Sequence, residues 1–137
     1  MEMVKLSRYK GKYVVLYFYP KDDTPGCTVE AIEFSDLEDE FSSHETVILG
    51  ISRDDCMSHA DFRDKHGLAV QLLSDVDGRI CERYGVWQEK EKDGVKKMGI
   101  VRSTFVIGKD GTVLQAFHGV QAKGHAMEIL NIIKELQ

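Results

Sequence analysis

The chain has 137 residues, a length typical of one folded domain, of which 42% are hydrophobic and 30% charged. Its formal net charge of −5 argues against nucleic-acid binding, which requires Lys and Arg side chains clustered on one face. The sequence has no apolar run of membrane-spanning length and no apolar segment at its start, so it predicts neither a membrane span nor a secretory signal.

The chain begins with a segment that indicates a strand followed by a helix. Residues 13–19 (YVVLYFY) form a short apolar and aromatic run, which predicts a buried central strand that ends at Pro20. Thr24 and Pro25 suit the N-cap and the first position of a helix, because proline lacks an N–H that this turn leaves unpaired. Apolar residues at helical spacing predict that the helix continues to about Phe41.

The middle of the chain alternates short strands with helices. Each strand is a short apolar run, and each helix begins near a residue that favours helix starts. Strands are predicted over residues 46–51 and 70–73, and helices over about 55–65 and 79–84.

The last third of the chain indicates a loop, a hairpin and a final helix. Residues 89–97 (EKEKDGVKK) are so charged that they predict a solvated loop or flap with a turn at its Asp-Gly pair. Two β-rich runs, 104–107 and 112–117, flank another Asp-Gly pair and predict a hairpin. Residues 125–136 carry an apolar stripe at helical spacing and predict a helix.

These elements together predict one α/β domain over residues 1–137, with a mixed five-stranded central sheet and helices on both faces. In such a sheet, ligands bind beyond the carboxyl ends of the parallel strands. Cys27 falls in the first turn of the helix at that edge, where free N–H groups and the helix dipole favour a thiolate. A thiolate alone accelerates a reaction too little, so a second group must stabilise the departing charge.

The segment around Cys27 resembles the active-site string of a known family. Residues 17–28 (YFYPKDDTPGCT) are similar to the Pro-x-x-x-Thr-x-x-Cys segment of peroxiredoxins, and more narrowly of the bacterioferritin-comigratory-protein group, also called PrxQ. The resemblance runs from about Leu6 to the end of the chain. It implies a thioredoxin-like fold and an antioxidant thiol peroxidase that reduces hydrogen peroxide and organic hydroperoxides. Further matching segments lie at residues 58–62, 72–75, 84–87 and 99–105.

The resemblance also implies roles for five residues. Cys27 would be the peroxidatic cysteine, Thr24 would place a hydroxyl beside it, and Pro20 would shield the pocket from water. Arg102 would hold the thiolate and the peroxide oxygens, and Glu30 would orient the arginine. The sulfenic acid formed on the cysteine would condense with a second thiol, and a thioredoxin-like dithiol would restore both. No cofactor and no metal is implied.

The resolving cysteine is where the sequence departs from the group. Ile32 and Arg63 occupy the two positions at which members carry it. Of the remaining cysteines, Cys56 is preferred over Cys81, because its helix is expected to begin at the same sheet edge as the helix of Cys27. A bridge requires Cα atoms within about 7 Å, so local unwinding is expected. A 1-Cys enzyme resolved by an outside thiol is an equal alternative to an internal disulfide.

Three other functions compete with a peroxidase. A thioredoxin-like disulfide reductase requires Cys-x-x-Cys, but Glu30 occupies the position of the second cysteine after Cys27. A metal-binding module requires clustered ligands, but the five histidines are scattered. A non-catalytic redox sensor or holdase would keep Cys27 and would differ from an enzyme only in its slow turnover.

The cellular setting follows from the cysteines and the N-terminus. Three widely separated cysteines without a secretory signal suit a reducing compartment, which predicts a cytoplasmic protein. We expect a monomer or weak dimer. The family normally has a β-hairpin before the segment that begins at Leu6, and only a stub stands there, so we expect a truncated N-terminal hairpin.

Overall fold

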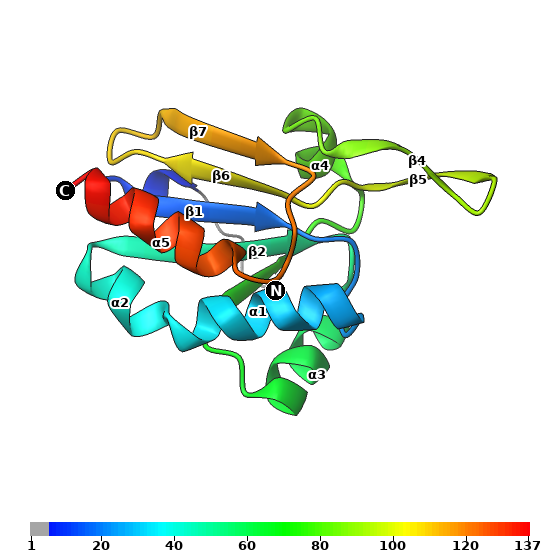
Figure 1. The fold of residues 1–137 in the computed structure, drawn as a ribbon, viewed down its shortest axis with the longest axis horizontal. Helices are drawn as coiled ribbons and strands as arrows, with labels where there is room; N and C mark the ends of the chain where they lie inside the picture. The colour runs from blue at the N-terminus through cyan, green and yellow to red at the C-terminus, as the bar shows by residue number, and fades with distance from the viewer. Residues whose placement is uncertain (1–5) are drawn as a thin grey trace.

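The computed structural model describes residues 6–137, and a five-stranded sheet forms their centre (Figure 1). The strand order is β3-β2-β1-β6-β7, and β1, β2 and β3 run parallel while β6 and β7 are antiparallel to their neighbours. The predicted mixed five-stranded sheet is thus confirmed. The predicted N-terminal stub, residues 1–5, lies outside the described residues. The strands are β1 (Tyr13–Phe18), β2 (Thr46–Ser52), β3 (Gln71–Ser74), β6 (Ser103–Ile107) and β7 (Val113–His118).

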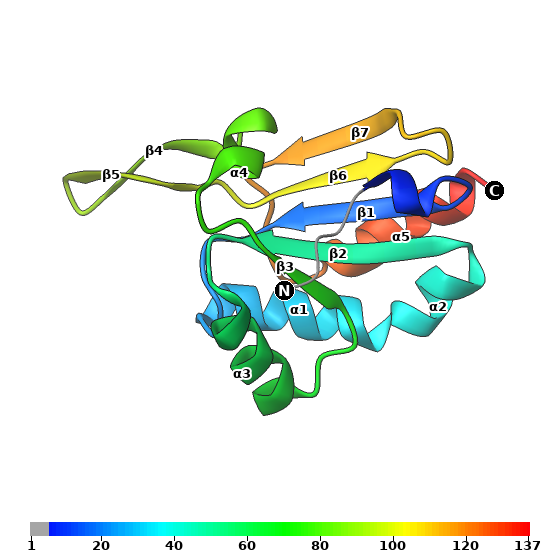
Figure 2. The same cartoon turned by 180° about the vertical axis from the view of Figure 1, so that it is seen from behind.

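Helices cover both faces of this sheet, as the sequence predicts. Four helices lie on the side that faces the viewer in Figure 1: α1 (Pro25–Asp36), α2 (Glu38–Ser43), α3 (Cys56–His66) and α5 (His125–Glu135). Figure 2 shows the opposite side, which carries α4 (Arg79–Arg83) and the short 3-10 helix η1 (Leu6–Tyr9). Among the described residues, none of the helices combines the length and the apolar character needed to cross a bilayer.

Strand β1 divides the hydrophobic core into two layers, because successive side chains of a strand point to opposite faces. Val15 and Tyr17 pack in the layer that contains α1 and α5. Val14, Leu16 and Phe18 pack in the layer that contains α4. Both faces of β1 are therefore buried, which explains why its sequence is a continuous apolar run.

The single helix predicted over residues 25–41 is wrong, because the helix is interrupted at Leu37 (φ −99°, ψ 2°). The N–H of Leu37 donates to the carbonyls of both Glu33 and Phe34, so the last turn of α1 tightens. The three acidic residues 38–40 then occupy the first turn of α2, where the helix dipole favours negative charge. They would lie in mid-helix if the helix continued.

The solvated loop or flap predicted at residues 89–97 is exposed and turns at Asp93-Gly94 as predicted, but it is not a loop, because the segment forms a second, two-stranded sheet. Strands β4 (Trp87–Lys92) and β5 (Val95–Ile100) pair antiparallel and project beyond the central sheet (Figure 1). Asp93 and Gly94 both have positive φ (55° and 78°), as a two-residue hairpin turn requires. Residues 88–98 are exposed, so the hairpin lacks the alternation of apolar and polar residues that identifies a strand in a sequence.

Candidate active site

The candidate site lies where β1, α1 and β6 meet at one edge of the sheet, on the right in Figure 1. Strand β1 ends at Phe18 and α1 begins at Pro25, so Cys27 lies in the first helical turn beyond the carboxyl end of β1. Strand β6 runs antiparallel to β1 and pairs Ser103 with Phe18. Arg102, the residue before β6, therefore reaches the same edge from a distant part of the chain.

The guanidinium of Arg102 bridges Cys27 and Glu30. Its Nη2 donates to Cys27 Sγ at 3.3 Å, and its Nη1 donates to Glu30 Oε1 at 2.7 Å. Cys27 is 1% exposed and Glu30 is 0% exposed. Because hydrogen bonds between charged groups are strong away from water, Glu30 fixes the guanidinium and the guanidinium stabilises the ionised form of Cys27.

Glu30 lies in an environment that penalises its charge. Burial raises the pKa of Glu30 to about 7, because the attraction of Arg102 offsets only part of the cost of desolvation. Its Oε2 and the hydroxyl of Tyr17 are buried without a hydrogen-bond partner among the described residues. Burial raises the pKa of Tyr17 too, and Glu30 and Cys27 add to this effect. The Cys27 thiolate and the Glu30 carboxylate thus share one partly buried cation, Arg102.

Thr24 occupies the N-cap position, but its side chain makes no capping bond. Its Oγ1 instead donates to the carbonyl of Lys21 at 2.8 Å. Because a hydroxyl has one proton and two lone pairs, Thr24 can then accept a hydrogen bond but has no proton left to donate. Pro20 is half-buried directly after β1.

The approach of Arg102 to the helix requires a glycine at position 26. A Cβ atom on Gly26 would lie 3.1 Å from Nη2 of Arg102, the same atom that donates to Cys27. Gly26 was not among the residues predicted for the site, although it directly precedes Cys27 in the active-site string. The only indication in the sequence that Gly26 belongs to the site was therefore its position next to Cys27.

The other two cysteines differ in their surroundings. Cys56 is exposed at the first residue of α3, and Ser74 Oγ donates to its Sγ at 3.6 Å. Cys81 is buried in the layer opposite the layer of Cys27, and burial raises the pKa of its thiol. The part of the chain that the structure describes contains all three cysteines and no disulfide.

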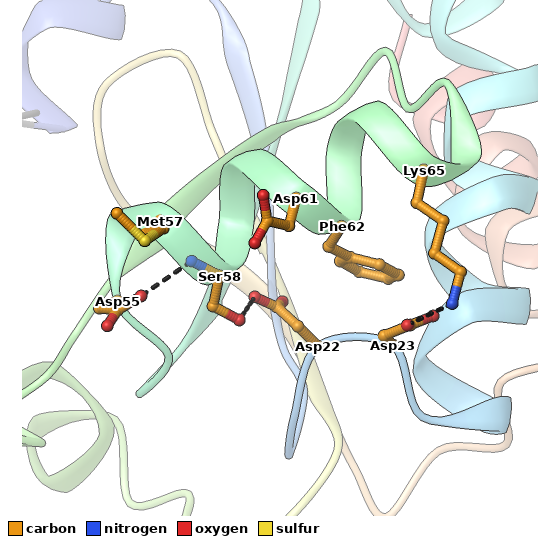
Figure 3. A pocket seen from close by; sticks show the side chains of 8 residues that line it. All are labelled: Asp22, Asp23, Asp55, Met57, Ser58, Asp61, Phe62 and Lys65. Atoms are coloured by element: carbon orange, nitrogen blue, oxygen red, sulfur yellow. Dashed lines mark hydrogen bonds and ion pairs between the residues drawn. The ribbon is translucent and has the colours of Figure 1, made fainter.

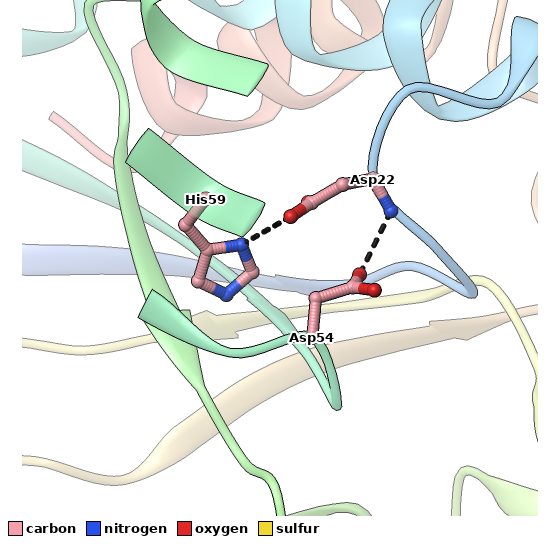
Figure 4. Close-up of side chains that lie close together, drawn as sticks. All are labelled: Asp22, Asp54 and His59. Atoms are coloured by element: carbon pink, nitrogen blue, oxygen red, sulfur yellow. Dashed lines mark hydrogen bonds and ion pairs between the residues drawn. The ribbon is translucent and has the colours of Figure 1, made fainter. Parts of the chain in front are cut away.

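Two histidines of α3 contact the loop that leads to Cys27, and neither was predicted to belong to the site. His59 Nδ1 lies 2.7 Å from Asp22 Oδ2, and His66 Nε2 lies 2.8 Å from Asp23 Oδ1. The backbone N–H of Asp22 also donates to Asp54 Oδ2 at 2.8 Å (Figure 4). Two signals were present in the sequence: the histidines are seven residues apart on one helix, and both aspartates belong to the active-site string.

The cluster drawn in Figure 4 has the residue types of a metal site, but both ring nitrogens of its histidine already face hydrogen-bond acceptors. Ligand atoms of Asp22, Asp54 and His59 lie within 4.8 Å of one another. His59 Nε2 faces the carbonyl oxygen of Leu73 at 2.9 Å, and Nδ1 faces the carboxylate of Asp22. A carboxylate and a carbonyl both accept hydrogen bonds, so these contacts favour a proton on each ring nitrogen. Burial lowers the pKa of His59, but the hydrogen bond and charge of Asp22 raise it above its ordinary value, which also favours the doubly protonated ring over a metal ligand.

A pocket of about 370 Å³ lies between the active-site loop and α3 (Figure 3). Its lining includes neither Cys27 nor Arg102, so this pocket is separate from the thiol site. Four of the residues that line it are acidic. The lining consists of Asp22, Asp23, Asp55, Met57, Ser58, Asp61, Phe62 and Lys65.

Comparison with known sequences places the chain in a family. The sequence profile of the AhpC/TSA family matches residues 1–116. Peroxiredoxin Bcp of Bacillus subtilis (strain 168) is 46% identical over 135 residues, which cover 98% of this chain and 86% of that protein. Peroxiredoxin Bcp of Xanthomonas campestris pv. campestris is 43% identical over 129 residues, covering 94% and 81% of the two chains.

Solved structures agree with the sequence comparison. The Xanthomonas campestris bacterioferritin comigratory protein superposes with a TM-score of 0.92 at 41% identity, covering 97% of this chain and 85% of that chain. A cysteine-to-serine mutant of Xylella fastidiosa PrxQ gives a TM-score of 0.93 at 41% identity, covering 97% and 82%.

The chain is thus a thiol peroxidase with a thioredoxin-like fold, and it belongs to the AhpC/TSA family. Within this family its relatives are the Bcp or PrxQ peroxiredoxins, as the resemblance in the sequence implies. The relatives favour an enzyme over the non-catalytic sensor or holdase that was the alternative.

Proposed function

We propose that Cys27 is the peroxidatic thiol and that it reduces hydrogen peroxide and organic hydroperoxides. The observation that supports this most directly is the hydrogen bond from Arg102 to Cys27 Sγ at 3.3 Å, with the guanidinium anchored by a buried carboxylate. Alkyl peroxide reduction is ascribed to the Xanthomonas campestris relative, which supports organic hydroperoxides as substrates here.

In the proposed reaction the Cys27 thiolate attacks the terminal peroxide oxygen. The S–O bond forms as the O–O bond breaks, which leaves a sulfenic acid on the cysteine and an alkoxide or hydroxide that takes a proton from water. Arg102 has further N–H groups to stabilise the departing oxygen. Thr24 Oγ1, whose proton is held by the Lys21 carbonyl, accepts the hydrogen of the attacked peroxide. Pro20 limits access of water to the thiol.

Trapping the sulfenic acid tests this assignment. Reduced protein is mixed with one equivalent of hydrogen peroxide in the presence of a 1,3-diketone that alkylates sulfenic acids, and the adduct is located by peptide mass spectrometry. The proposal expects the adduct on Cys27. An adduct confined to Cys56 or Cys81 would contradict it.

We further propose that Cys56 resolves the sulfenic acid. Cys56 is exposed and begins α3, whereas Cys81 packs on the other side of the sheet from Cys27. The Cys56 thiolate attacks the Cys27 sulfur, the S–O bond breaks and water leaves, so a disulfide forms. A thioredoxin-like dithiol then reduces this disulfide to two thiols while its own pair is oxidised.

Non-reducing peptide mapping after one equivalent of peroxide, without the trapping reagent, tests the resolving step. The expected product is a peptide pair that joins Cys27 to Cys56. A Cys27–Cys81 pair would refute the choice of Cys56. A Cys27 sulfenic or sulfinic acid with both other thiols intact would show the 1-Cys alternative, in which an outside thiol resolves the enzyme.

We also propose a cytoplasmic setting and a monomeric or weakly dimeric state. Three cysteines far apart in the sequence suit a reducing compartment better than a disulfide framework. Strand β7 is an edge of the central sheet and exposes Val113 and Leu114, which offers a small surface for weak self-association. Sedimentation velocity over a range of protein concentrations measures this association, and a tight dimer at low concentration would contradict the proposal.

A further inference from the structure

Asp22 joins the active-site loop to helix α3 by buried hydrogen bonds. Its Oδ1 accepts from Tyr19 Oη at 2.6 Å. Its Oδ2 accepts from Ser58 Oγ at 2.8 Å and from His59 Nδ1 at 2.7 Å. Figure 3 shows Ser58 reaching the Asp22 carboxylate from α3, and Figure 4 shows His59 doing so. The loop is thus held from both the strand before it and the helix across from it.

The contact between Asp22 and His59 depends on the charge of the imidazole. His59 donates from Nδ1 to Asp22 and from Nε2 to the carbonyl of Leu73 in β3. A neutral imidazole has one N–H, so it can keep only one of these two bonds. Loss of the second proton therefore breaks one of these two bonds, either the bond to the loop or the bond to β3.

The same two segments carry the cysteines that the proposed disulfide must join. Asp22 lies five residues before Cys27, and His59 lies three residues after Cys56. Cys27 Sγ is buried against Arg102, and Cys56 Sγ contacts Ser74. Because Cys27 is buried and Cys56 is exposed, we expect the start of α1 or of α3 to move before the two sulfurs can bond.

We propose that Asp22 and His59 are positioning residues: their ion pair, here called the Asp22–His59 clasp, holds the Cys27 segment against α3, and its opening limits disulfide formation without affecting peroxide attack. The effect on disulfide formation rests on the proposed roles of Cys27 and Cys56. The restraint on the loop does not, because it follows from the hydrogen bonds alone.

The charges around the clasp favour its closed, ionised form. Burial disfavours the imidazolium, but the hydrogen bond and charge of Asp22 raise the pKa of His59 above its ordinary value, with Asp54 contributing. Burial also disfavours the carboxylate, but hydrogen bonds led by that of His59 hold the pKa of Asp22 below its ordinary value. The clasp therefore opens as the pH rises through the pKa of His59. The groups that face His59 are Asp22, Asp54, Tyr19 and the Leu73 carbonyl.

Hydrogen exchange of the reduced protein tests the restraint directly. In His59→Gln, amides of residues 19–28 should lose about tenfold in protection, because a buried hydrogen bond between charged groups is removed. His66→Gln is the matched control, since His66 contacts the neighbouring Asp23 from a partly exposed position where ion pairs are weak. Equal protection in the two variants would overturn the proposal.

Asp22→Asn separates the clasp from a general loss of folding. This variant keeps the size of the side chain. It also alters the bonds from Tyr19 and Ser58, but adding His59→Gln to it should have less effect than His59→Gln has alone, because the Asp22–His59 interaction is already lost. The wild-type protection of residues 19–28, corrected for intrinsic exchange, should fall as the pH rises through the pKa of His59 and should stay flat in His59→Gln. Additive effects, or a pH dependence that survives in His59→Gln, would contradict the clasp.

Rapid-quench kinetics test the link to the redox cycle. His59→Gln should form the disulfide about tenfold faster after one equivalent of peroxide, while the rate of peroxide consumption stays within about twofold of wild type. An unchanged rate of disulfide formation would refute the kinetic role. Failure of Cys27 to react with peroxide would instead refute the proposed function, and the exchange experiment would still report on the restraint.

Discussion

At the scale of single residues, the site depends on one cation that serves two anions. Arg102 donates one N–H to Cys27 and another to Glu30, both buried. A point charge at this position would attract the thiolate, but only a planar guanidinium can hold two partners with separate nitrogen atoms. In the proposed mechanism, the geometry of Arg102 is therefore needed as well as its charge.

Replacing Arg102 tests this view. Arg102→Met should slow peroxide oxidation of the protein by about 10²–10³-fold, because a donor to the developing charge is lost. Stopped-flow measurement of the second-order rate constant gives the effect. Arg83→Met is the control, since Arg83 is exposed at the end of α4, and it should keep the wild-type rate.

Gly26→Ala should displace the guanidinium of Arg102 without removing it, unlike Arg102→Met. The added methyl would lie 3.1 Å from Arg102 Nη2, so the guanidinium must shift by a few tenths of an ångström away from Cys27. We expect an approximately three- to tenfold lower rate of peroxide oxidation, because reactivity depends steeply on placement. The melting temperature should not fall, because alanine favours a helix more than glycine does. A full wild-type rate would show that the contact is not needed.

Individual residues of the site could be predicted from the sequence where they belong to a local string. Cys27, Thr24 and Glu30 lie within seven residues, and cap signals place them at a helix start. Arg102 is 75 residues from Cys27, so only the family resemblance could connect them. The Asp22–His59 contact spans 37 residues and was missed, because nothing local to either residue indicates its partner.

At the scale of elements, the β4–β5 hairpin supports the site from outside the main sheet. Its base includes Ile100, which is buried, and Lys90 Nζ donates to the Ile100 carbonyl at 2.6 Å. Burial lowers the pKa of Lys90, the charge of Arg102 adds to this effect, and the charge of Cys27 opposes it. The hairpin thus fixes the chain two residues before Arg102 and brings a second cation near the thiol.

A substitution in the turn of the β4–β5 hairpin should destabilise the hairpin without destabilising the rest of the domain. Gly94→Ala places a side chain at φ 78°, which costs about 1–2 kcal/mol. Amide protection in residues 88–98 should fall, while the melting temperature of the domain should be unchanged because these residues are exposed. Asp93→Asn is the control, since asparagine tolerates positive φ. Global destabilisation by Gly94→Ala would contradict this view of the hairpin.

Elements were predictable where their residues form an apolar or β-rich run, even where a strand such as β7 is largely exposed. Strands β1 and β2 are buried and were found from their apolar runs. Strands β4 and β5 are held together by backbone hydrogen bonds, and most of their side chains are exposed, many of them charged. The periodicity of apolar residues therefore could not reveal these strands. The break at Leu37 was hidden for another reason: Phe34 and Phe41 keep helical spacing across it and pack in the same layer.

At the scale of the whole molecule, the two-layered core places Cys27 and Cys81 on opposite sides of the sheet. It also buries the carboxyl group of Glu30, which destabilises the folded state when that group is ionised. Cys27 and Glu30 belong to the side of α1, and Cys81 belongs to the side of α4. Since burial raises the pKa of Glu30 to about 7 from 4.5, the native state retains a proton there that the unfolded state loses between these pH values. Stability should therefore fall across this interval as the pH rises.

Glu30→Gln tests this pH-dependent loss of stability. The free energy of unfolding of the variant, relative to wild type, should rise by about 3 kcal/mol between pH 4.5 and pH 8, because glutamine has no proton to lose. Urea denaturation at a series of pH values gives the difference. Glu135→Gln, at an exposed position, is the control and should show no such trend. A difference independent of pH would contradict the burial argument.

The fold class, the sheet and the family were all within reach of the sequence, because the βαβ order and the Pro-x-x-x-Thr-x-x-Cys string are both local patterns. The Asp22–His59 contact was not, and the contacts of Arg102 with Cys27 and Glu30 were expected only through the family resemblance, because both sets of contacts join segments that are distant in the chain. For the whole molecule, function thus depends on contacts whose partners are far apart in the chain.

The most direct test of the central role of Cys27 is stopped-flow measurement of peroxide consumption in the first turnover, without any reductant. Wild type, Cys56→Ser and Cys81→Ser should each rapidly consume one equivalent of hydrogen peroxide, whereas Cys27→Ser should consume it no faster than an unactivated thiol. Consumption of a full equivalent by Cys27→Ser at the wild-type rate would contradict the account.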